Sequence, residues 1–163
     1  MLSGKFINIG FNVRPTEIQG AFGIHQIKKL ENFIKIRREN AKYWMERLRK
    51  YSDYLILHEE KKYTKAVWFG YPITVKTNAP FTRNELMCYL ESKGIETRPI
   101  MAGNMAEQPA MRILKHKVIG DLHNSRLIMR NSFFFGNHNS IGESQREYIA
   151  DCIEQFIKGR GIS

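Results

Sequence analysis

Apolar residues between positions 27 and 48 recur at alternating spacings of three and four. The series is Ile27, Leu30, Ile34, Ala41, Trp44 and Leu48, and Arg37 interrupts it. Such spacing keeps the side chains on one helical face for about six turns. Pro15 and Thr16 precede the series with a helix-start pattern, because proline is tolerated in a first helical turn. The pattern predicts two helices, or one kinked helix, from about residue 16 to about residue 50.

Two strands and a well-bounded helix are predicted in the middle of the chain. Residues 55–57 form a short apolar run, and residues 66–75 are rich in β-branched and aromatic side chains, which favours a strand. Pro72 lacks a backbone N–H and therefore predicts a sheet edge or a bulge. Residues 82–85 (Thr-Arg-Asn-Glu) have the spacing of a capping box, and Gly94 ends the helix that they begin.

The second half of the chain predicts further short elements. We expect a strand over 96–100, a short helical piece near 106–114, a helix over 121–129 and a buried strand over 132–136. Ser140 is expected to cap a final helix whose apolar face is Ile149, Cys152, Ile153, Phe156 and Ile157. The order predicts an α+β fold, with long N-terminal helices packed on a small mixed or antiparallel sheet. We expect residues 1–163 to form one domain.

Length and composition agree with a folded domain. A chain of 163 residues with 42% hydrophobic content is large enough for one ordinary core. No apolar run approaches the ~18 residues of a membrane span, and the N-terminus does not resemble a signal peptide. Cys88 and Cys152 stand apart without metal-site or redox spacing, so both are predicted to be reduced structural thiols of a cytoplasmic protein. The histidine spacings predict no metal site.

The net charge of +10 favours an anionic partner. Nine basic residues against three acidic ones lie between residues 28 and 50. A solvated helix face is the preferred interpretation of this run. A basic module that binds nucleic acid is a remote alternative, because no nucleic-acid-binding signature accompanies the charge.

Two polar, glycine-bearing stretches are the candidates for function. Residues 94–109 (GIETRPIMAGNMAEQP) follow the capped helix without a clean period, and residues 10–17 (GFNVRPTE) precede the first helix. Polar, turn-rich segments bury little apolar area, so a ligand or partner is a reason for them to exist. An ordinary surface loop is the alternative for each.

Residues 10–30 (GFNVRPTEIQGAFGIHQIKKL) resemble the DegT/StrS family of sugar aminotransferases. The family motif runs Gly-aromatic-Asn-x-Arg, then an acidic residue with Ile/Met-Gln-Ala-Ala, then Gln-Leu before a basic helix. This chain departs from it at Gly20, which replaces the first alanine, and at Phe22, which follows the second. Glu96-Thr-Arg98, Gly103-Asn104 and Gln108-Pro109 look most like the sugar-nucleotide 3-dehydratases of that family. An aminotransferase with an atypical loop remains the alternative.

The resemblance implies the C-terminal portion of a fold-type I enzyme that uses pyridoxal or pyridoxamine 5'-phosphate. The cofactor-binding large domain would be absent from these 163 residues, with residues 1–14 leading in from it. The substrate would be a nucleotide-linked 4-keto-6-deoxy sugar of lipopolysaccharide biosynthesis. A homodimer with a site shared across subunits, and a possible reductase partner, are also implied. The catalytic group would lie upstream, where Lys indicates transamination and His indicates dehydration, so the chain alone is expected to be inactive.

The resemblance also suggests roles for individual residues. Asn12 and Arg14 would bind the cofactor phosphate of the neighbouring subunit, and their amide and guanidinium donors suit that task. Arg98, Asn104 and His138 would face the sugar nucleotide. The alternatives are that Arg98 pairs with Glu96, that Asn104 occupies a left-handed turn beside Gly103, and that His138 bonds the backbone of its own turn. We interpret His25 as an interface histidine.

Overall fold

The computed structural model describes residues 15–161 and divides the chain into two compact units, Met1–Asn32 and Phe33–Ser163. The first unit contains α1 (Glu17–Ile27), which buries none of its residues. Thr16 begins this helix, and its backbone N–H donates to Gln19 Oε1 over 2.9 Å. The predicted break between two helices is confirmed, because α2 (Leu30–Leu48) starts three residues after α1 ends.

The second unit is built on a four-stranded antiparallel sheet in the order β1-β2-β4-β3. The strands are β1 (Leu55–Leu57), β2 (Gly70–Val75), β3 (Thr97–Pro99) and β4 (Ser132–Gly136). The helices are α2 from Phe33 onward, α3 (Arg83–Ser92), α4 (His123–Asn131) and α5 (Glu143–Lys158), with three short 3₁₀ helices at Arg49–Tyr51, Met105–Glu107 and Pro109–Ile113. The predicted α+β class and antiparallel sheet are therefore confirmed.

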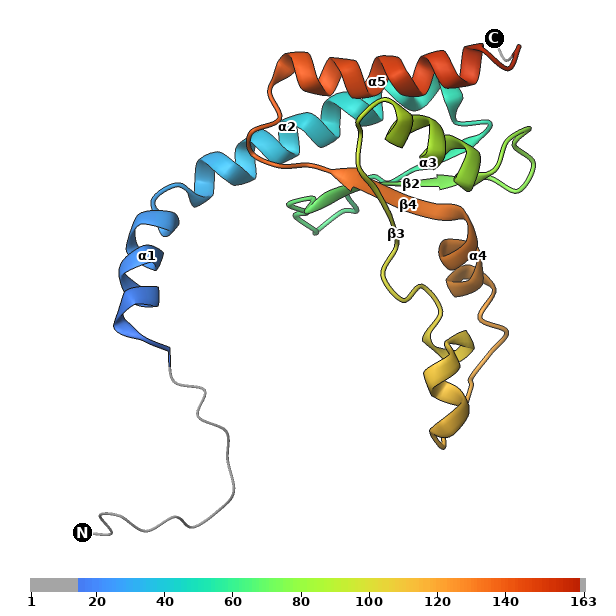
Figure 1. The fold of residues 1–163 in the computed structure, drawn as a ribbon, viewed down its shortest axis with the longest axis horizontal. Helices are drawn as coiled ribbons and strands as arrows, with labels where there is room; N and C mark the ends of the chain where they lie inside the picture. The colour runs from blue at the N-terminus through green and yellow to red at the C-terminus, as the bar shows by residue number, and fades with distance from the viewer. Residues whose placement is uncertain (1–14, 162–163) are drawn as a thin grey trace. The chain divides into compact units, whose positions relative to one another are not determined.

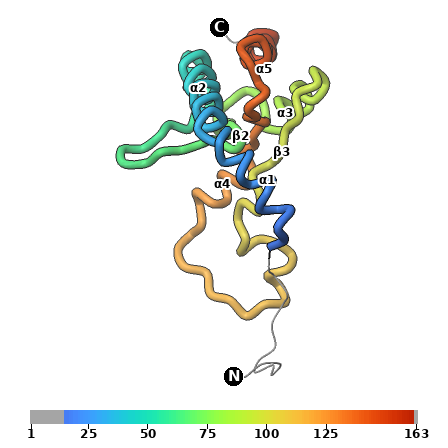
Figure 2. The backbone as a smooth tube through the Cα atoms, turned by 90° about the vertical axis from the view of Figure 1, so that its left-hand side faces the viewer, coloured from blue at the N-terminus to red at the C-terminus, as the bar shows by residue number. Residues whose placement is uncertain are grey.

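The helices are divided between the two faces of the sheet. Figure 1 shows α2, α3 and α5 on one side, and α4 with the segment that leads to it from β3 on the other. The perpendicular view in Figure 2 gives the same division and shows this yellow-to-orange segment extending away from the sheet. None of the helices in residues 15–161 combines the length and apolar character needed to cross a lipid bilayer.

The core lies between the sheet and the α2, α3 and α5 layer. Trp44 is fully buried, and its ring meets Phe135 edge-on with the centroids 4.9 Å apart. Its indole N–H donates to the carbonyl of Arg146 over 2.9 Å, so the one polar atom of the ring is satisfied. The predicted apolar face of the last helix is buried throughout. The predicted face of α2 is buried from Ala41 onward, whereas Leu30 is exposed.

Several predicted boundaries need revision. Strand β2 is internal rather than an edge strand, but Pro72 lies beyond Ile73, the last residue that β1 pairs, so its missing N–H breaks no ladder on that side. Ser140 does not cap the final helix. That role falls to Gly142, whose N–H donates to Gln145 Oε1 over 3.1 Å. The predicted helical piece near 106–114 is two 3₁₀ turns.

Other local predictions are confirmed. Glu85 Oε2 accepts the Thr82 N–H over 2.7 Å, and Thr82 Oγ1 accepts the Glu85 N–H over 3.2 Å, which completes the capping box. Gly94 has a φ of +77°, a conformation that glycine adopts at little cost where a helix ends. Cys88 is exposed and Cys152 is buried, and neither forms a disulfide. Their reduced state stays a prediction.

Candidate functional site

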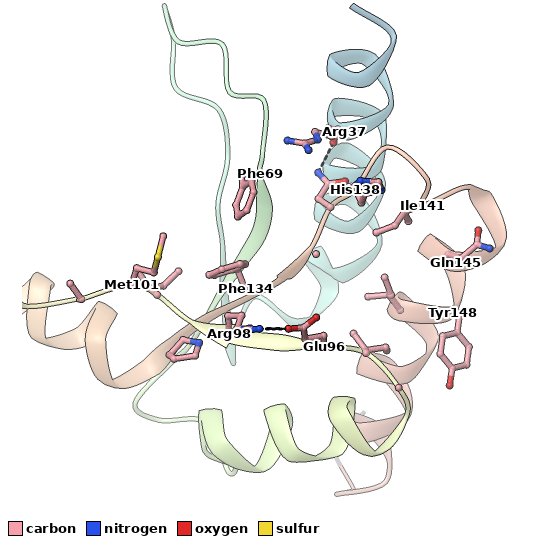
Figure 3. A pocket seen from close by; sticks show the side chains of 18 residues that line it. Arg37, Phe69, Glu96, Arg98, Met101, Phe134, His138, Ile141, Gln145 and Tyr148 are labelled. Carbon is pink, nitrogen blue, oxygen red and sulfur yellow. Dashed lines mark hydrogen bonds and ion pairs between the residues drawn. The ribbon is translucent and has the colours of Figure 1, made fainter. Parts of the chain in front are cut away.

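The second unit contains a cavity of about 900 Å³ beside the edge formed by β3 and the end of β4. Figure 3 shows that its walls come from α2, the loop before β2, β3 with its flanking residues, the turn after β4, and the start of α5. Its volume lies within the range of ~300–1,000 Å³ that is usual for small-molecule sites. Apolar side chains dominate the lining, and a few polar groups converge on it.

The stretch that the sequence singles out, residues 94–109, divides into two parts. Residues 94–96 and 98–102 line the cavity. The remainder packs near α4, where Gly103 lies so close that an added Cβ would stand 2.7 Å from Met129 Cα. Gln108 Nε2 donates to the Ala102 carbonyl over 2.9 Å and closes this part on itself. One loop therefore supplies both a cavity wall and a packing contact.

Arg98 lies on the cavity wall and is also paired. Its Nε and Nη2 donate to Glu96 Oε1 over 2.9 and 2.6 Å, as Figure 3 shows. Both side chains are exposed, so the pair contributes little to stability. The two interpretations of Arg98 are thus compatible, because a paired guanidinium at a cavity wall still has N–H groups for a ligand.

Asn104 does not line the cavity. It is 3% exposed, and its Nδ2 has no hydrogen-bond partner among the described residues. Its φ of −105° shows that the left-handed alternative is wrong for this residue. The left-handed positions are its neighbours Ala102 (φ +60°) and Gly103 (φ +55°). A contact of Asn104 with substrate stays a prediction.

His138 lines the cavity from the turn after β4. Its Nδ1 accepts the backbone N–H of Ser140 over 3.2 Å, as the alternative predicted. That hydrogen bond assigns the ring proton to Nε2 in the neutral form, which leaves Nε2 as the donor. His138 can therefore hold its turn and still offer one N–H to a ligand.

A pair of buried asparagines fixes the same turn. Asn137 is 1% exposed, and its Nδ2 donates to the carbonyls of Arg37 and Trp68 over 2.9 and 3.1 Å. Asn40 Nδ2 donates to the Ile141 carbonyl over 2.9 Å and lies 3.4 Å from Asn137 Oδ1. These bonds join α2, the loop before β2 and the turn after β4, which are three walls of the cavity.

The site residues predicted from the stretch 10–17 are not among those that the structure describes. Asn12 and Arg14 lie outside the described residues. His25 is exposed in α1, and no contact supports or excludes its assignment to an interface. Within residues 15–161 no three His, Cys, Asp or Glu side chains come together as a metal site would require.

Sequence reasoning missed Arg37, Phe69 and Asn137, all of which line the cavity. A signal for Arg37 was present, since it is the charged residue that interrupts the apolar face of its helix. Asn137 had a weaker signal as the first polar side chain after a run of three phenylalanines. Phe69 had no such signal, because an aromatic residue in a predicted strand is expected to belong to the core.

Comparison with known proteins extends these observations. A family model described as the DegT/DnrJ/EryC1/StrS aminotransferase family matches residues 2–154. The GDP-4-keto-6-deoxy-D-mannose 3-dehydratase of Escherichia coli O55:H7 is 33% identical over 93% of this chain and 39% of its own length. The lipopolysaccharide biosynthesis protein RfbH of Salmonella typhimurium strain LT2 is 31% identical over 93% of this chain and 35% of its own.

A solved structure agrees with these relatives. The Escherichia coli GDP-4-keto-6-deoxy-D-mannose 3-dehydratase with bound hydrated pyridoxal phosphate superimposes with a TM-score of 0.83 at 34% identity. The match covers 93% of this chain and 38% of that one. The 163 residues thus span between one third and two fifths of the length of these relatives.

Proposed function

The chain belongs to the DegT/DnrJ/EryC1/StrS aminotransferase family, and from this membership we propose that it is the small C-terminal domain of a sugar-nucleotide 3-dehydratase. The substrate would be a nucleotide-linked 4-keto-6-deoxy sugar that loses its C3 hydroxyl group during lipopolysaccharide synthesis. The reaction would take place in the cytoplasm.

The ranking of relatives is the observation that carries this proposal. Three 3-dehydratases, from Escherichia coli O55:H7, Yersinia pseudotuberculosis and Saccharopolyspora spinosa, are 30–36% identical over 83–93% of this chain. The GDP-perosamine synthase of Escherichia coli O157:H7 is 29% identical, and the dTDP-4-amino-4,6-dideoxy-D-glucose transaminase of Shigella dysenteriae is 24% identical. The preference for dehydratases agrees with the resemblance of residues 96–109. The aminotransferase remains the second candidate.

The charge distribution argues against the nucleic-acid alternative. Six of the nine basic residues between Lys28 and Lys50 have an acidic partner within 4 Å: Lys35, Arg38, Lys42, Arg47, Arg49 and Lys50. A nucleic-acid-binding face needs basic groups that are available to neutralise phosphates. Acidic side chains beside these residues therefore offset much of the positive charge of the run.

The described residues allow a limited test of the cofactor. Among the described residues that line the cavity there is no lysine, so none of them could hold pyridoxal phosphate covalently. The donors that are present, on Arg37, Arg98 and His138, suit an anionic group. When bound in the complete enzyme, the pyridoxamine cofactor would supply the electron sink for loss of the hydroxyl group.

In this proposal the chain binds and orients rather than performing the proton transfer. Asn12 and Arg14 would donate to the cofactor phosphate of the neighbouring subunit in a homodimer. Arg98 and His138 would form part of the wall of the sugar-nucleotide cleft. A separate reductase would accept the product if the pathway removes the oxygen completely.

Two hybrid enzymes test the proposal. In one, this chain replaces the matching part of the Escherichia coli O55:H7 3-dehydratase. In the other, it replaces the matching part of the O157:H7 GDP-perosamine synthase. We expect the dehydratase hybrid to consume its GDP-linked 4-keto sugar with loss of the C3 hydroxyl, detected by mass spectrometry, and the synthase hybrid to be inactive. Activity of the synthase hybrid alone would overturn the proposal in favour of the aminotransferase.

Asn12→Ala in the active hybrid tests the assignment to the cofactor phosphate. We expect the fraction of enzyme that retains cofactor after gel filtration to fall at least about tenfold, because a charge-assisted hydrogen bond to phosphate is lost. Cofactor absorbance measures this without reference to turnover. Asn139→Ala is the matched control, and equal retention in the two variants would remove Asn12 from the site.

A further inference from the structure

Residues 109–120 lie on the side of the sheet opposite the α2, α3 and α5 layer. They belong to the yellow-to-orange segment between β3 and α4 that Figure 2 shows extending away from the sheet. Every residue from 112 to 120 is exposed. The backbone groups of residues 115–120 form no hydrogen bond with other described backbone groups. In the described part of the protein, the segment 112–119 is therefore open to its surroundings.

Four aliphatic side chains of this segment are largely exposed. Ile113 is 87% exposed, Leu114 57%, Val118 48% and Ile119 80%. A single exposed aliphatic residue is common on protein surfaces and needs no explanation. Four of them within seven residues form a patch, and such a patch marks a surface that meets an apolar environment.

Uncompensated positive charges are interleaved with these side chains. Arg112, Lys115 and Lys117 are exposed, and none has an acidic partner within 4 Å among the described residues. Residues 108–120 contain no acidic side chain. The acidic residue that precedes them, Glu107, lies within 4 Å of two arginines of α4 instead. The segment therefore presents three positive charges and no negative charge.

This interleaving of cations with aliphatic side chains distinguishes between candidate partners. A protein that covered Ile113 and Ile119 would also bury parts of three cations, which is costly, and charged residues are depleted in the cores of protein interfaces. A nucleic acid would pair with the cations but would leave the aliphatic side chains in water. A membrane surface with anionic lipids accommodates both kinds of side chain. The aliphatic groups enter the boundary of the acyl chains, while the long basic side chains reach the headgroups.

The backbone of the segment limits how deeply it can enter a lipid layer. Unpaired N–H and C=O groups are costly in the hydrocarbon interior, where no water can bond them. The backbone of residues 115–120 has no such partners among the described backbone groups, so it has to stay at the level of the hydrated headgroups. Only the aliphatic side chains can go deeper. Such a segment lies on a membrane surface and does not cross it.

We propose that the segment 112–119 binds reversibly to membrane surfaces that contain anionic lipids. Its three cations attract the lipid headgroups, and its four aliphatic side chains enter the interface. Three charges and four small apolar groups give weak attachment, so the protein exchanges between the membrane and solution. This attachment involves neither the cavity nor the reaction, and it determines where the protein is held.

Sedimentation of the 163-residue chain with lipid vesicles tests the membrane site. Vesicles of phosphatidylcholine with about 40% phosphatidylglycerol should bind the chain at least about tenfold more strongly than phosphatidylcholine alone, and high salt should weaken the binding. Lys115→Gln with Lys117→Gln should weaken binding to the anionic vesicles at least about tenfold, because each cation near an anionic surface contributes to the attraction. Ile113→Ser with Ile119→Ser should weaken it about as much, because two of the inserted side chains are lost.

Lys61→Gln with Lys62→Gln is the matched control. Both lysines are exposed in the loop before β2, and neither has an acidic partner within 4 Å in the described part of the chain. The control removes the same charge from another place, so binding should stay within about twofold of the parent. Circular dichroism shows that each variant is folded. Equal weakening by the control, equal binding to both kinds of vesicle, or no binding by the folded parent would overturn the site.

Two further measurements separate a lipid surface from a protein partner. Poly-L-glutamate that binds the chain more tightly than the anionic vesicles would overturn the membrane site in favour of an acidic protein surface. The dehydratase hybrid should bind anionic vesicles as the 163-residue chain does. Loss of this binding in the hybrid would also overturn the site, and protection of residues 112–119 from hydrogen exchange would then identify the upstream part of the enzyme as the occupant. Turnover is not measured, so the membrane site and the proposed function fail separately.

Discussion

At the scale of single residues, Asn137 connects two walls of the cavity. It is buried in a turn, and the two N–H groups of its side-chain amide donate to carbonyls of other segments. Each bond closes a distance of many residues along the chain, so no local signal demands an amide here. The side chain acts as a cross-link between α2 and the loop before β2.

Asn137→Ala is therefore expected to lower the free energy of unfolding by about 2–4 kcal/mol, because the carbonyls of Arg37 and Trp68 each lose a donor. Chemical denaturation measures the change. Asn139→Ala, two positions along, is the control, since no side-chain hydrogen bond involves Asn139 in the described residues, and it should change stability by less than about 0.5 kcal/mol. Equal effects of the two substitutions would contradict the cross-link.

The candidate residues show how far sequence reasoning reaches at this scale. Arg98 and His138 were placed at a site by resemblance, and both line the cavity. Asn104 does not, because the chain turns away from the cavity at Ala102 and Gly103, which both have left-handed conformations. Nothing in the sequence predicted that conformation for an alanine. The sequence shows Arg37 as a charged residue that interrupts an apolar helical face. Its role could not be predicted, because that role depends on which residues the fold brings opposite it.

At the scale of elements, the pairing of β2 with β4 contains a close approach at one end. Gly70 and Gly136 are paired, yet their surroundings differ. A Cβ on Gly70 would overlap the ring of Phe134 and stand 3.0 Å from the Phe135 carbonyl oxygen, whereas a Cβ on Gly136 would meet nothing within 4 Å. The bare backbone of Gly70 thus leaves the space that the Phe134 ring occupies at the cavity.

Gly70→Ala should destabilise the protein by about 1–3 kcal/mol, as overpacking does, and should shift the aromatic NMR signals of Phe134. Gly136→Ala is the control and is expected to be within about 0.5 kcal/mol of the parent. Similar destabilisation by both changes would show that the strand pairing itself, and not the Phe134 contact, excludes side chains here.

The packing of α2 on α5 contains a charge cluster with a defined pH dependence. Glu154 is 6% exposed, and its carboxylate accepts from Arg47 Nε over 2.9 Å and lies 3.0 Å from Lys50 Nζ. Burial alone would raise the pKa of Glu154, but the hydrogen bonds from Arg47 and Lys50 outweigh it and hold the pKa below its usual value of 4.5. As the pH falls, the Glu154 carboxylate is therefore protonated in the unfolded chain before it is protonated in the folded one. The stabilisation that it gives above pH 4.5 is lost as the pH falls through the folded pKa.

Glu154→Gln should lower the free energy of unfolding by about 1–3 kcal/mol at pH 7 and flatten its decline below about pH 5. Denaturation at several pH values measures both effects. Glu147→Gln is the control on the same helix, because Glu147 is exposed and has no ion pair in the described residues, so the acid dependence should persist. A decline equally steep in Glu154→Gln and the parent would contradict the role of this carboxylate.

Most elements were predictable because their signals are local. The capping box, the apolar face of the last helix and the strand over 132–136 depend on residues close in sequence, and all three were confirmed. The errors arose where tertiary pairing decides. Pro72 is compatible with an internal strand only because β1 is short. The residues around Pro72 carry no information about the length of β1.

At the scale of the whole molecule, a large apolar surface stays open in the first unit. Four residues of α1, namely Ile18, Phe22, Ile24 and Ile27, are each 61–70% exposed. Exposed apolar patches of this kind mark interaction surfaces. The exposed side chains of α1 therefore give a reason to expect that the chain alone self-associates or binds apolar molecules.

We expect the 163-residue chain to sediment above monomer mass at micromolar concentration, or to bind an apolar dye as a monomer. The double substitution Ile18→Ser and Phe22→Ser should reduce either signal by more than half, because it removes two of the four apolar side chains. Gln26→Ser is the control on the same helix. A parent chain that is monomeric and binds no dye would contradict this expectation.

The contribution of α5 to the core has a consequence for synthesis of the protein on the ribosome. Ile153, Phe156 and Ile157 fill the core next to Trp44 and Leu48, which are made about a hundred residues earlier. Until α5 has left the exit tunnel, the apolar faces of α2 and of the sheet remain open to water and to chaperones. The second unit therefore completes its fold only after α5 has been made, and a stop codon before residue 143 would release a chain that cannot close its core.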